Sequence, residues 1–293
     1  MKDILLIFLF CLALMIGVSL HSGPDSLTYD ASFSPFSAPA KPKVKTKKVF
    51  LRQFEWIDPT KIKRQTSFYI PEKELKREIK KFGTRRASAH PLFMERKGFK
   101  VVGRKTFYHN NRLHERVITV VDYKKIFQRN LKYFASFTSL LSASAALSDT
   151  ADPLYHFLTF VQHIDYRLPP NKYHGRFINS FFVPLVCLYE QYGDCDSKSL
   201  LLADFLCTTK AALNAPKGKG EKVAMVLIRG NGLAHALLAA KRKALPGMTS
   251  LFDIKRGSFI LLETTHPGWA PGFISRRVMD AVKAGFFQFV ELN

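Results

Sequence analysis

Apolar residues recur at three- and four-residue steps through the middle of the chain, the spacing that places them on one face of a helix. This pattern predicts a long helix over residues 123–147 and a second helix over residues 153–164. No such pattern covers residues 167–182, where we expect a loop. A short helix is then predicted at residues 183–189.

Short apolar runs bounded by turn residues predict strands in the rest of the chain. In the C-terminal part they lie at residues 223–228, 236–240, 259–263 and 286–292. Upstream, residues 99–107 and 116–121 have strand composition, and residues 109–112 would form the turn of a hairpin. A helix is predicted over residues 71–82, which Gly83 would end.

The first residues have the pattern of an export signal. Met1, Lys2 and Asp3 precede an apolar run from residue 4 to residue 20. We therefore expect residues 1–22 to be a cleaved signal peptide or a retained membrane anchor, and the protein to be exported to the periplasm or to face outside the cytoplasm. Residues 23–48 are rich in Pro and Lys, and we expect a linker there.

The charge of the chain is strongly positive. Its 45 Lys and Arg against 23 Asp and Glu give a formal net charge of +22, with many cations between residues 41 and 86. Such a charge favours an anionic partner, such as a cell-envelope polymer or a membrane surface, although it can also be a solvated face. No zinc finger, helix-turn-helix pattern or aromatic platform accompanies the cations, so the sequence does not favour nucleic acid.

Residues 49–122 predict a basic mixed α/β region in which we recognise no chemistry. Its histidines, His90, His109 and His114, are irregularly spaced and predict no metal site. The cysteines form no CxxC pair, so zinc is not indicated either, and the sequence predicts no cofactor.

Of the four cysteines, Cys195 has the most polar surroundings. It stands between Asp194 and Asp196, just before the apolar run of residues 200–206. Asp194 would be the N-cap of that buried helix and Cys195 would lie in its first turn, where the helix dipole lowers the pKa of a thiol. A merely buried thiol is the competing interpretation. Cys187 and Cys207 are expected to be buried, or paired with each other; a disulfide from either to Cys195 would silence the site.

A thiol nucleophile needs a base and a group that orients the base. His235 follows a Gly-Asn-Gly turn and precedes an apolar strand, whereas His266 lies in a Pro-Gly turn. Glu263 ends a strand of apolar residues, where a carboxylate is costly unless it has a partner. Asp253, in a turn-like stretch, is the less convincing alternative to Glu263.

Three motifs together resemble the bacterial transglutaminase-like superfamily. They are Gly193-Asp194-Cys195-Asp196 before a Leu-rich helix, Ala234-His235-Ala236, and Leu262-Glu263-Thr264-Thr265 before a Pro-Gly pair; residues 160–166 fit the same pattern. The resemblance spans roughly residues 153–269 and implies an α+β fold with a papain-like core, in which a Cys-bearing helix packs on an antiparallel sheet that carries the His and the acid. We expect the catalytic domain to cover residues 123–293. Many relatives have Asp where Glu263 stands.

As a hypothesis, Cys195 attacks a peptide or amide carbonyl, His235 transfers the proton, and Glu263 orients His235. The backbone N–H of Cys195 would form part of an oxyanion hole, with a side-chain donor sought in Gln191 or Tyr192. Water as the acceptor gives hydrolysis of a protein or peptide substrate, and an amine gives transamidation. The alternative is a non-catalytic binding or scaffold protein on the same fold.

Overall fold

The computed structural model describes residues 48–85, 91–109, 112–145, 147, 152–209, 214, 221–230, 232–242, 250–253 and 257–293. These residues belong to one compact unit. The signal or anchor expected at residues 1–22 and nearly all of the linker expected at residues 23–48 lie outside them. Among the described residues, no helix combines the length and the apolar content that crossing a membrane requires.

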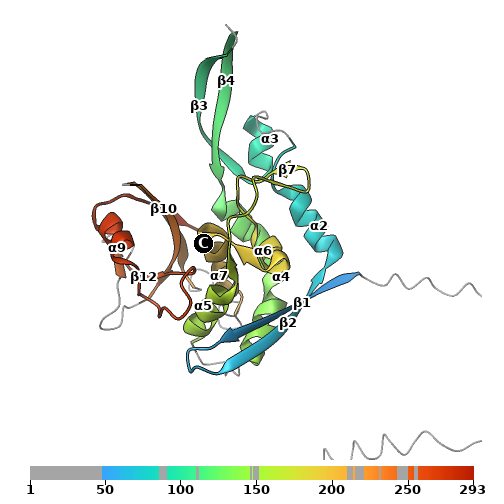
Figure 1. Cartoon of the computed structure of the whole chain (residues 1–293), viewed down its shortest axis with the longest axis vertical. Helices are drawn as coiled ribbons and strands as arrows, with labels where there is room; N and C mark the ends of the chain where they lie inside the picture. The colour runs from blue at the N-terminus through green and yellow to red at the C-terminus, as the bar shows by residue number, and fades with distance from the viewer. Residues whose placement is uncertain are drawn as a thin grey trace, which may run out of the picture. The chain divides into compact units, whose positions relative to one another are not determined.

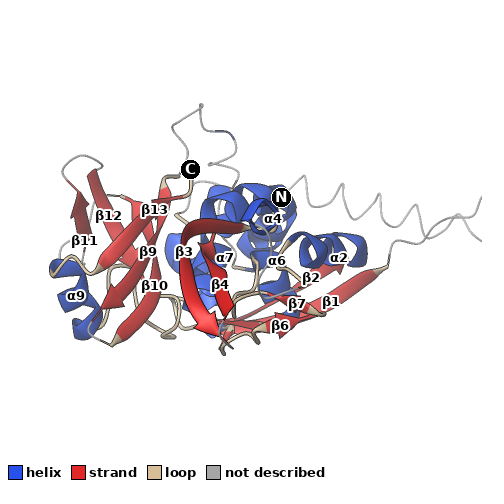
Figure 2. Cartoon of the chain, turned by 90° about the horizontal axis from the view of Figure 1, so that it is seen from above, coloured by secondary structure: helices blue, strands red, loops and turns tan. Residues whose placement is uncertain are grey.

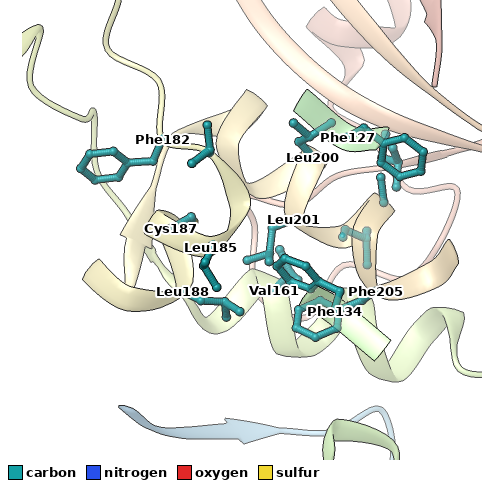
Figure 3. Close-up of a cluster of buried hydrophobic side chains, with 14 of the residues drawn as sticks. Phe127, Phe134, Val161, Phe182, Leu185, Cys187, Leu188, Leu200, Leu201 and Phe205 are labelled. Carbon is teal, nitrogen blue, oxygen red and sulfur yellow. The ribbon is translucent and has the colours of Figure 1, made fainter. Parts of the chain in front are cut away.

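Helix α7 (Cys195–Cys207) lies at the centre of the molecule (Figure 1). Three helices surround it: α4 (Tyr123–Ser144), α5 (Leu154–His163) and α6 (Pro184–Glu190). Residues 197–206 of α7 are all buried, because the helix is apolar on nearly every side and must be covered on every side. Figure 3 shows the resulting core, in which side chains of α4, α5 and α6 gather around Leu201 and Phe205.

A five-stranded antiparallel sheet covers the remaining side of α7. Its order is β11 (Ser250–Asp253), β12 (Gly257–Leu262), β10 (Leu233–Lys241), β9 (Val223–Gly230) and β13 (Phe287–Glu291). Its other face packs against α9 (Arg276–Lys283), so the sheet lies between α9 and the helices (Figure 2). Along β10, Ala236 and Leu238 face α7, whereas Leu237 and Ala239 face α9. Burial on both faces explains why the strands read as continuous apolar runs.

The N-terminal elements complete the same core. Strands β1 (Val49–Ile57) and β2 (Lys63–Pro71) form a hairpin over α4 and α5, and α2 (Glu72–Lys81) and α3 (Pro91–Arg96) follow it. Strands β3 (Phe99–His109) and β4 (Arg112–Val121) form a second hairpin, which extends away from the helices (Figure 1). The Phe160 ring lies 5.4 Å from Phe54 and 5.3 Å from Trp56, so residues 49–122 share one core with the rest.

The structure confirms the α+β class and most of the elements expected from the sequence. The predicted helices, the β3–β4 hairpin and four C-terminal strands are present within a few residues of their expected bounds. The expected loop at residues 167–182 contains two very short strands, β6 (Lys172–Tyr173) and β7 (Arg176–Phe177). The β1–β2 hairpin, β11 and α9 were not expected. Of the three histidines named above, His90 and the side chains of His109 and His114 are not described.

One charged residue inside the core has no visible partner. Asp204 of α7 is fully buried, and neither of its carboxyl oxygens has a hydrogen-bond partner within the described structure. Burial, together with the nearby charge of Glu78, raises the pKa of Asp204 well above its usual value. In the unfolded chain the same carboxyl ionises near its ordinary pKa of about 4. Stability should therefore fall as the pH rises above that value.

We predict that Asp204→Asn, which keeps the shape and removes the ionisation, makes the protein more stable at pH 8. The gain should be about 1–3 kcal/mol, since a difference of one pKa unit between the folded and unfolded states corresponds to about 1.4 kcal/mol, and it should largely vanish near pH 4.5. Urea unfolding at the two pH values measures it. An equal difference at both pH values would show that ionisation of Asp204 is not its cause.

Candidate active site

Cys195 is the first residue of α7, as expected. Asp194 is the N-cap, and its Oδ1 accepts a hydrogen bond from the backbone N–H of Ser197 at 3.2 Å. The chain reaches this cap through Gly193, where an added Cβ would lie only 2.8 Å from the Cys187 sulfur and 3.0 Å from the Ser197 Cβ. Close packing between α6 and the start of α7 therefore requires glycine at position 193.

The N-terminal part of α7 lies against β10 at the point where a neighbouring strand ends. Pairing between β12 and β10 stops at Leu262 and Leu238. Beyond that point the Ser199 hydroxyl donates to the Ala236 carbonyl at 3.5 Å, and the Cys195 sulfur lies beside the Ala236 backbone N–H. Cys195 and Ser199 are one helical turn apart, so one face of α7 meets both polar groups of Ala236. The thiol thus lies against the peptide that joins Ala236 to His235.

His235 is held by Glu263. The imidazole Nε2 lies 2.7 Å from Glu263 Oε2, and the two side chains are 13% and 1% exposed. The other carboxylate oxygen accepts hydrogen bonds from the Thr265 backbone N–H at 2.9 Å and hydroxyl at 2.6 Å. Although burial raises it, these hydrogen bonds and the nearby imidazole bring the pKa of Glu263 below its usual value. With Nε2 taken by Glu263, Nδ1 is the ring nitrogen that remains to act as a base.

The alternatives to His235 and Glu263 lie elsewhere. His266 is half exposed, its Nδ1 is 4.0 Å from Glu263 Oε1, and its ring stacks on Trp269. Asp253 ends β11 and pairs with Gly257, at the far end of β12 from Glu263. His235 itself is the third residue of β10, although it was expected just before the strand.

The expected low pKa of Cys195 is wrong for this structure. Burial, together with the charges of the Asp196 and Asp194 carboxyl groups, raises the pKa of the thiol to about 12. The backbone N–H groups of Ala236 and Asp196 act in the opposite direction but are outweighed. The helix N-terminus does favour a thiolate, as the sequence analysis assumed, yet two flanking acids and poor solvation favour the neutral thiol.

The two flanking acids form a pair. Their carboxyl groups share a hydrogen bond, and Asp196 Oδ1 also accepts from the Ser197 N–H at 3.1 Å. The Tyr123 hydroxyl, from the start of α4, donates to Asp196 Oδ2 at 2.5 Å. Burial, followed by the charge of Asp194, raises the pKa of Asp196 well above its usual value. The closeness of the two carboxyl groups therefore favours a proton on Asp196 over a second negative charge. Neither the pair nor Tyr123 was assigned a role from the sequence.

The side chains considered for the oxyanion hole have other partners. Gln191 Nε2 donates to the Gln53 carbonyl at 2.7 Å, so its amide ties α6 to β1. The Tyr192 ring lies 3.9 Å from the Arg167 guanidinium and packs on Phe182. One N–H of the Gln191 amide is thus engaged by β1, and these contacts give neither side chain a position at the thiol.

Tyr166 is a better candidate for that donor. It belongs to β5 (Asp165–Tyr166), which pairs in parallel with β8 (Tyr192–Gly193), so Tyr166 stands opposite Gly193. The side chain is 59% exposed. Partial burial raises the pKa of Tyr166, and the closeness of Cys195 raises it further. The motif at residues 160–166 pointed to this segment without assigning the tyrosine a role.

Gln162 and Lys198 fix the backbone around the acid. Gln162 Nε2 donates to the Glu263 carbonyl at 2.8 Å and to the Trp269 carbonyl at 2.9 Å, which ties the acid-bearing turn to α5. The buried Lys198 ammonium donates to the Gln162 and Ile164 carbonyls at 3.2 and 2.6 Å. Burial lowers the pKa of Lys198 to about 8. Neither residue was assigned this role from the sequence.

Cys187, Cys195 and Cys207 are all free thiols, so no disulfide silences Cys195. Within the described part of the chain, no three His, Cys, Asp or Glu residues gather as a metal site requires. Comparison of the chain with family models, with characterised proteins and with solved structures finds no significant match. Any inference about activity therefore depends on the geometry of this site.

We predict that the double variant Asp194→Asn/Asp196→Asn lowers the pKa of Cys195, because it removes the acids and keeps the side-chain shapes. Alkylation of Cys195 by iodoacetamide at pH 8.5 should become about 3- to 10-fold faster, since one pKa unit changes the thiolate fraction tenfold. Peptide mass spectrometry measures the rate.

The matched control is Asp165→Asn/Asp280→Asn, which changes two exposed carboxylates outside the pair. It should leave the rate unchanged. If the two double variants behave alike, the Asp194–Asp196 pair is not what keeps the thiol neutral.

Proposed function

We propose that this protein is a thiol-dependent acyl-transfer enzyme with a papain-like, transglutaminase-like core, which hydrolyses a peptide or amide bond outside the cytoplasm. Residues 123–293 carry the catalytic groups. One observation carries the proposal: the Cys195 thiol lies against the His235–Ala236 peptide while a buried carboxylate, Glu263, holds the His235 ring at 2.7 Å. A nucleophile, a base and an orienting acid are the elements of a catalytic triad.

The raised pKa of Cys195 determines how the first step would run. The resting sulfur is a neutral thiol, so His235 Nδ1 must accept its proton as the sulfur attacks the carbonyl carbon. The C–S bond forms and the carbonyl electrons move to oxygen. When the tetrahedral intermediate collapses, the C–N bond breaks and His235 returns the proton to the leaving amine. A thioester on Cys195 remains.

Water completes the cycle in the hydrolytic reaction. His235 Nδ1 accepts a proton from the water as its oxygen attacks the thioester carbon. The C–S bond then breaks, the acid product leaves, and the proton returns to sulfur. An amine in place of water would give transamidation by the same steps. We favour hydrolysis because no feature of the sequence indicates a site for an amine acceptor.

Glu263 and Tyr166 support these steps in different ways. Glu263 holds the neutral imidazole in the tautomer with its proton on Nε2, and it stabilises the imidazolium formed after proton transfer. The oxyanion would be bound by the backbone N–H of Cys195 and by the Tyr166 hydroxyl. Because Tyr166 is largely exposed, its hydroxyl would gain strength as a donor when substrate excludes water.

The second candidate is a binding protein on the same fold, without catalysis. It is favoured by the net charge of +22 and by the protonated state of the thiol at neutral pH. A binding protein, however, has no use for a carboxylate buried to 1% exposure and held to a histidine whose backbone adjoins the thiol. We therefore favour the enzyme.

We predict that His235→Ala slows alkylation of Cys195 by iodoacetamide by about 100-fold at pH 7.5, because the thiol then loses its proton acceptor. Glu263→Gln should slow it as well, by at least about tenfold. The rate at Cys195 is read by peptide mass spectrometry, which separates it from Cys187 and Cys207.

The matched control is His266→Ala, which removes a neighbouring, exposed histidine and should have no effect. Any cleavage found in a library of fluorescent peptides should be lost in His235→Ala and retained in His266→Ala. Cys195→Ala serves as the inactive reference. If wild type and His235→Ala are alkylated at the same rate, the triad does not operate and the binding protein is the better account.

A further inference from the structure

A groove of about 400 Å³ lies between three parts of the chain that the catalytic steps do not use. Its walls are the base of the β3–β4 hairpin, the first residues of α4, and the strands β9 and β13. Sites that bind small molecules or peptide side chains commonly enclose about 300–1,000 Å³. The groove is therefore large enough to hold a few side chains of a peptide.

Two residues that line the groove contact or face residues adjacent to Cys195. Tyr123 donates its hydroxyl to Asp196, the residue after Cys195, at 2.5 Å. Leu227 of β9 lies directly opposite Ala236 of β10, whose N–H lies beside the Cys195 sulfur. Residues directly opposite in an antiparallel pair have their Cβ atoms about 5 Å apart. Two lining residues from independent elements thus have direct partners that adjoin the thiol.

The groove presents an apolar floor and a cationic rim. The floor consists of the apolar side chains Phe99, Val120, Val121, Leu227 and Val290. The exposed cations Lys100, Lys124 and Arg229 surround it, and Lys125 is held by a hydrogen bond to the Glu95 carbonyl. The acids that line the groove, Glu95 and Asp122, are outnumbered, and Asp122 also caps α4.

This combination favours one kind of occupant. A polyphosphate chain would leave the apolar floor uncovered and would bring its charges near Glu95 and Asp122. An acidic peptide with alternating apolar residues can place carboxylates on the rim and apolar side chains on the floor. We infer that the groove binds an acidic, partly apolar segment of the substrate and so positions the neighbouring amide bond at Cys195. This inference rests on the proposed function and gives it a substrate class.

The test is direct binding of a defined probe to the full-length protein carrying Cys195→Ala, which prevents turnover. The probe is a fluorescein-labelled peptide of alternating Glu and Leu, with an alternating Lys and Leu peptide as the charge control. Fluorescence anisotropy measures affinity. The Glu/Leu peptide should bind at least about tenfold more weakly when Lys100, Lys124 and Arg229 are all replaced by Glu.

A second triple variant matches that change in charge away from the groove. It replaces Lys73, Lys132 and Arg276, which are also exposed, by Glu. The inference requires this variant to keep its affinity within about twofold of the parent. If both triple variants weaken binding equally, only the total charge matters, and the assignment of the groove fails.

Inorganic polyphosphate, added as a competitor, separates the two anionic chemistries. Polyphosphate that displaces the peptide at a lower concentration of negative charge than unlabelled peptide would overturn the acidic-peptide assignment. Dependence of Cys195 alkylation on His235, measured separately, decides the proposed function. If alkylation depends on His235 but peptide binding is unselective, only the assignment of the groove is rejected. If peptide binding is selective but alkylation does not depend on His235, the enzyme is rejected and the binding groove is kept.

Discussion

Burial of the N-terminal end of α7 is the constraint on which the rest of the site depends. A buried helix end leaves backbone N–H groups without water, and they require acceptors from the protein. Asp194 and Asp196 supply them, and both converge on the Ser197 N–H at 3.2 and 3.1 Å. The acids that make this burial possible also surround the thiol and raise its pKa. Packing of the helix and the ionisation of Cys195 are therefore consequences of one arrangement.

In the proposed mechanism, the same burial makes Cys195 dependent on His235. A thiolate formed in advance would need solvent or cations, and this site offers the sulfur two backbone N–H groups and two acids. In that mechanism, proton transfer to the imidazole at the moment of attack would avoid the cost of a resting buried charge. Glu263 can hold the imidazole for this transfer because hydrogen bonds with His235 and Thr265 satisfy its own charge, and because Gln162 fixes its backbone.

Much of this arrangement follows from local sequence patterns. The N-cap at Asp194, the position of Cys195 in α7 and the pairing of His235 with Glu263 rest on short motifs and on the cost of an isolated buried carboxylate. The sign of the shift in thiol pKa could not be found in this way, because it depends first on how deeply the thiol is buried by distant parts of the chain, and then on the charges of Asp196 and Asp194. The contact of the Gln191 amide with Gln53, 138 residues away, could not be found for a similar reason. No sequence pattern in β1 indicates that contact.

The neutral state of Cys195 affects how fast the thiol would be oxidised in an oxidising environment. Peroxides and disulfides react with thiolates far faster than with thiols, and the rate follows the thiolate fraction and the access to sulfur. A thiol with a pKa of about 12 and limited exposure presents very little thiolate at neutral pH. The site would thus resist sulfenic acid formation and mixed disulfides between turnovers, and would expose a reactive sulfur only when a bound carbonyl draws the proton to His235.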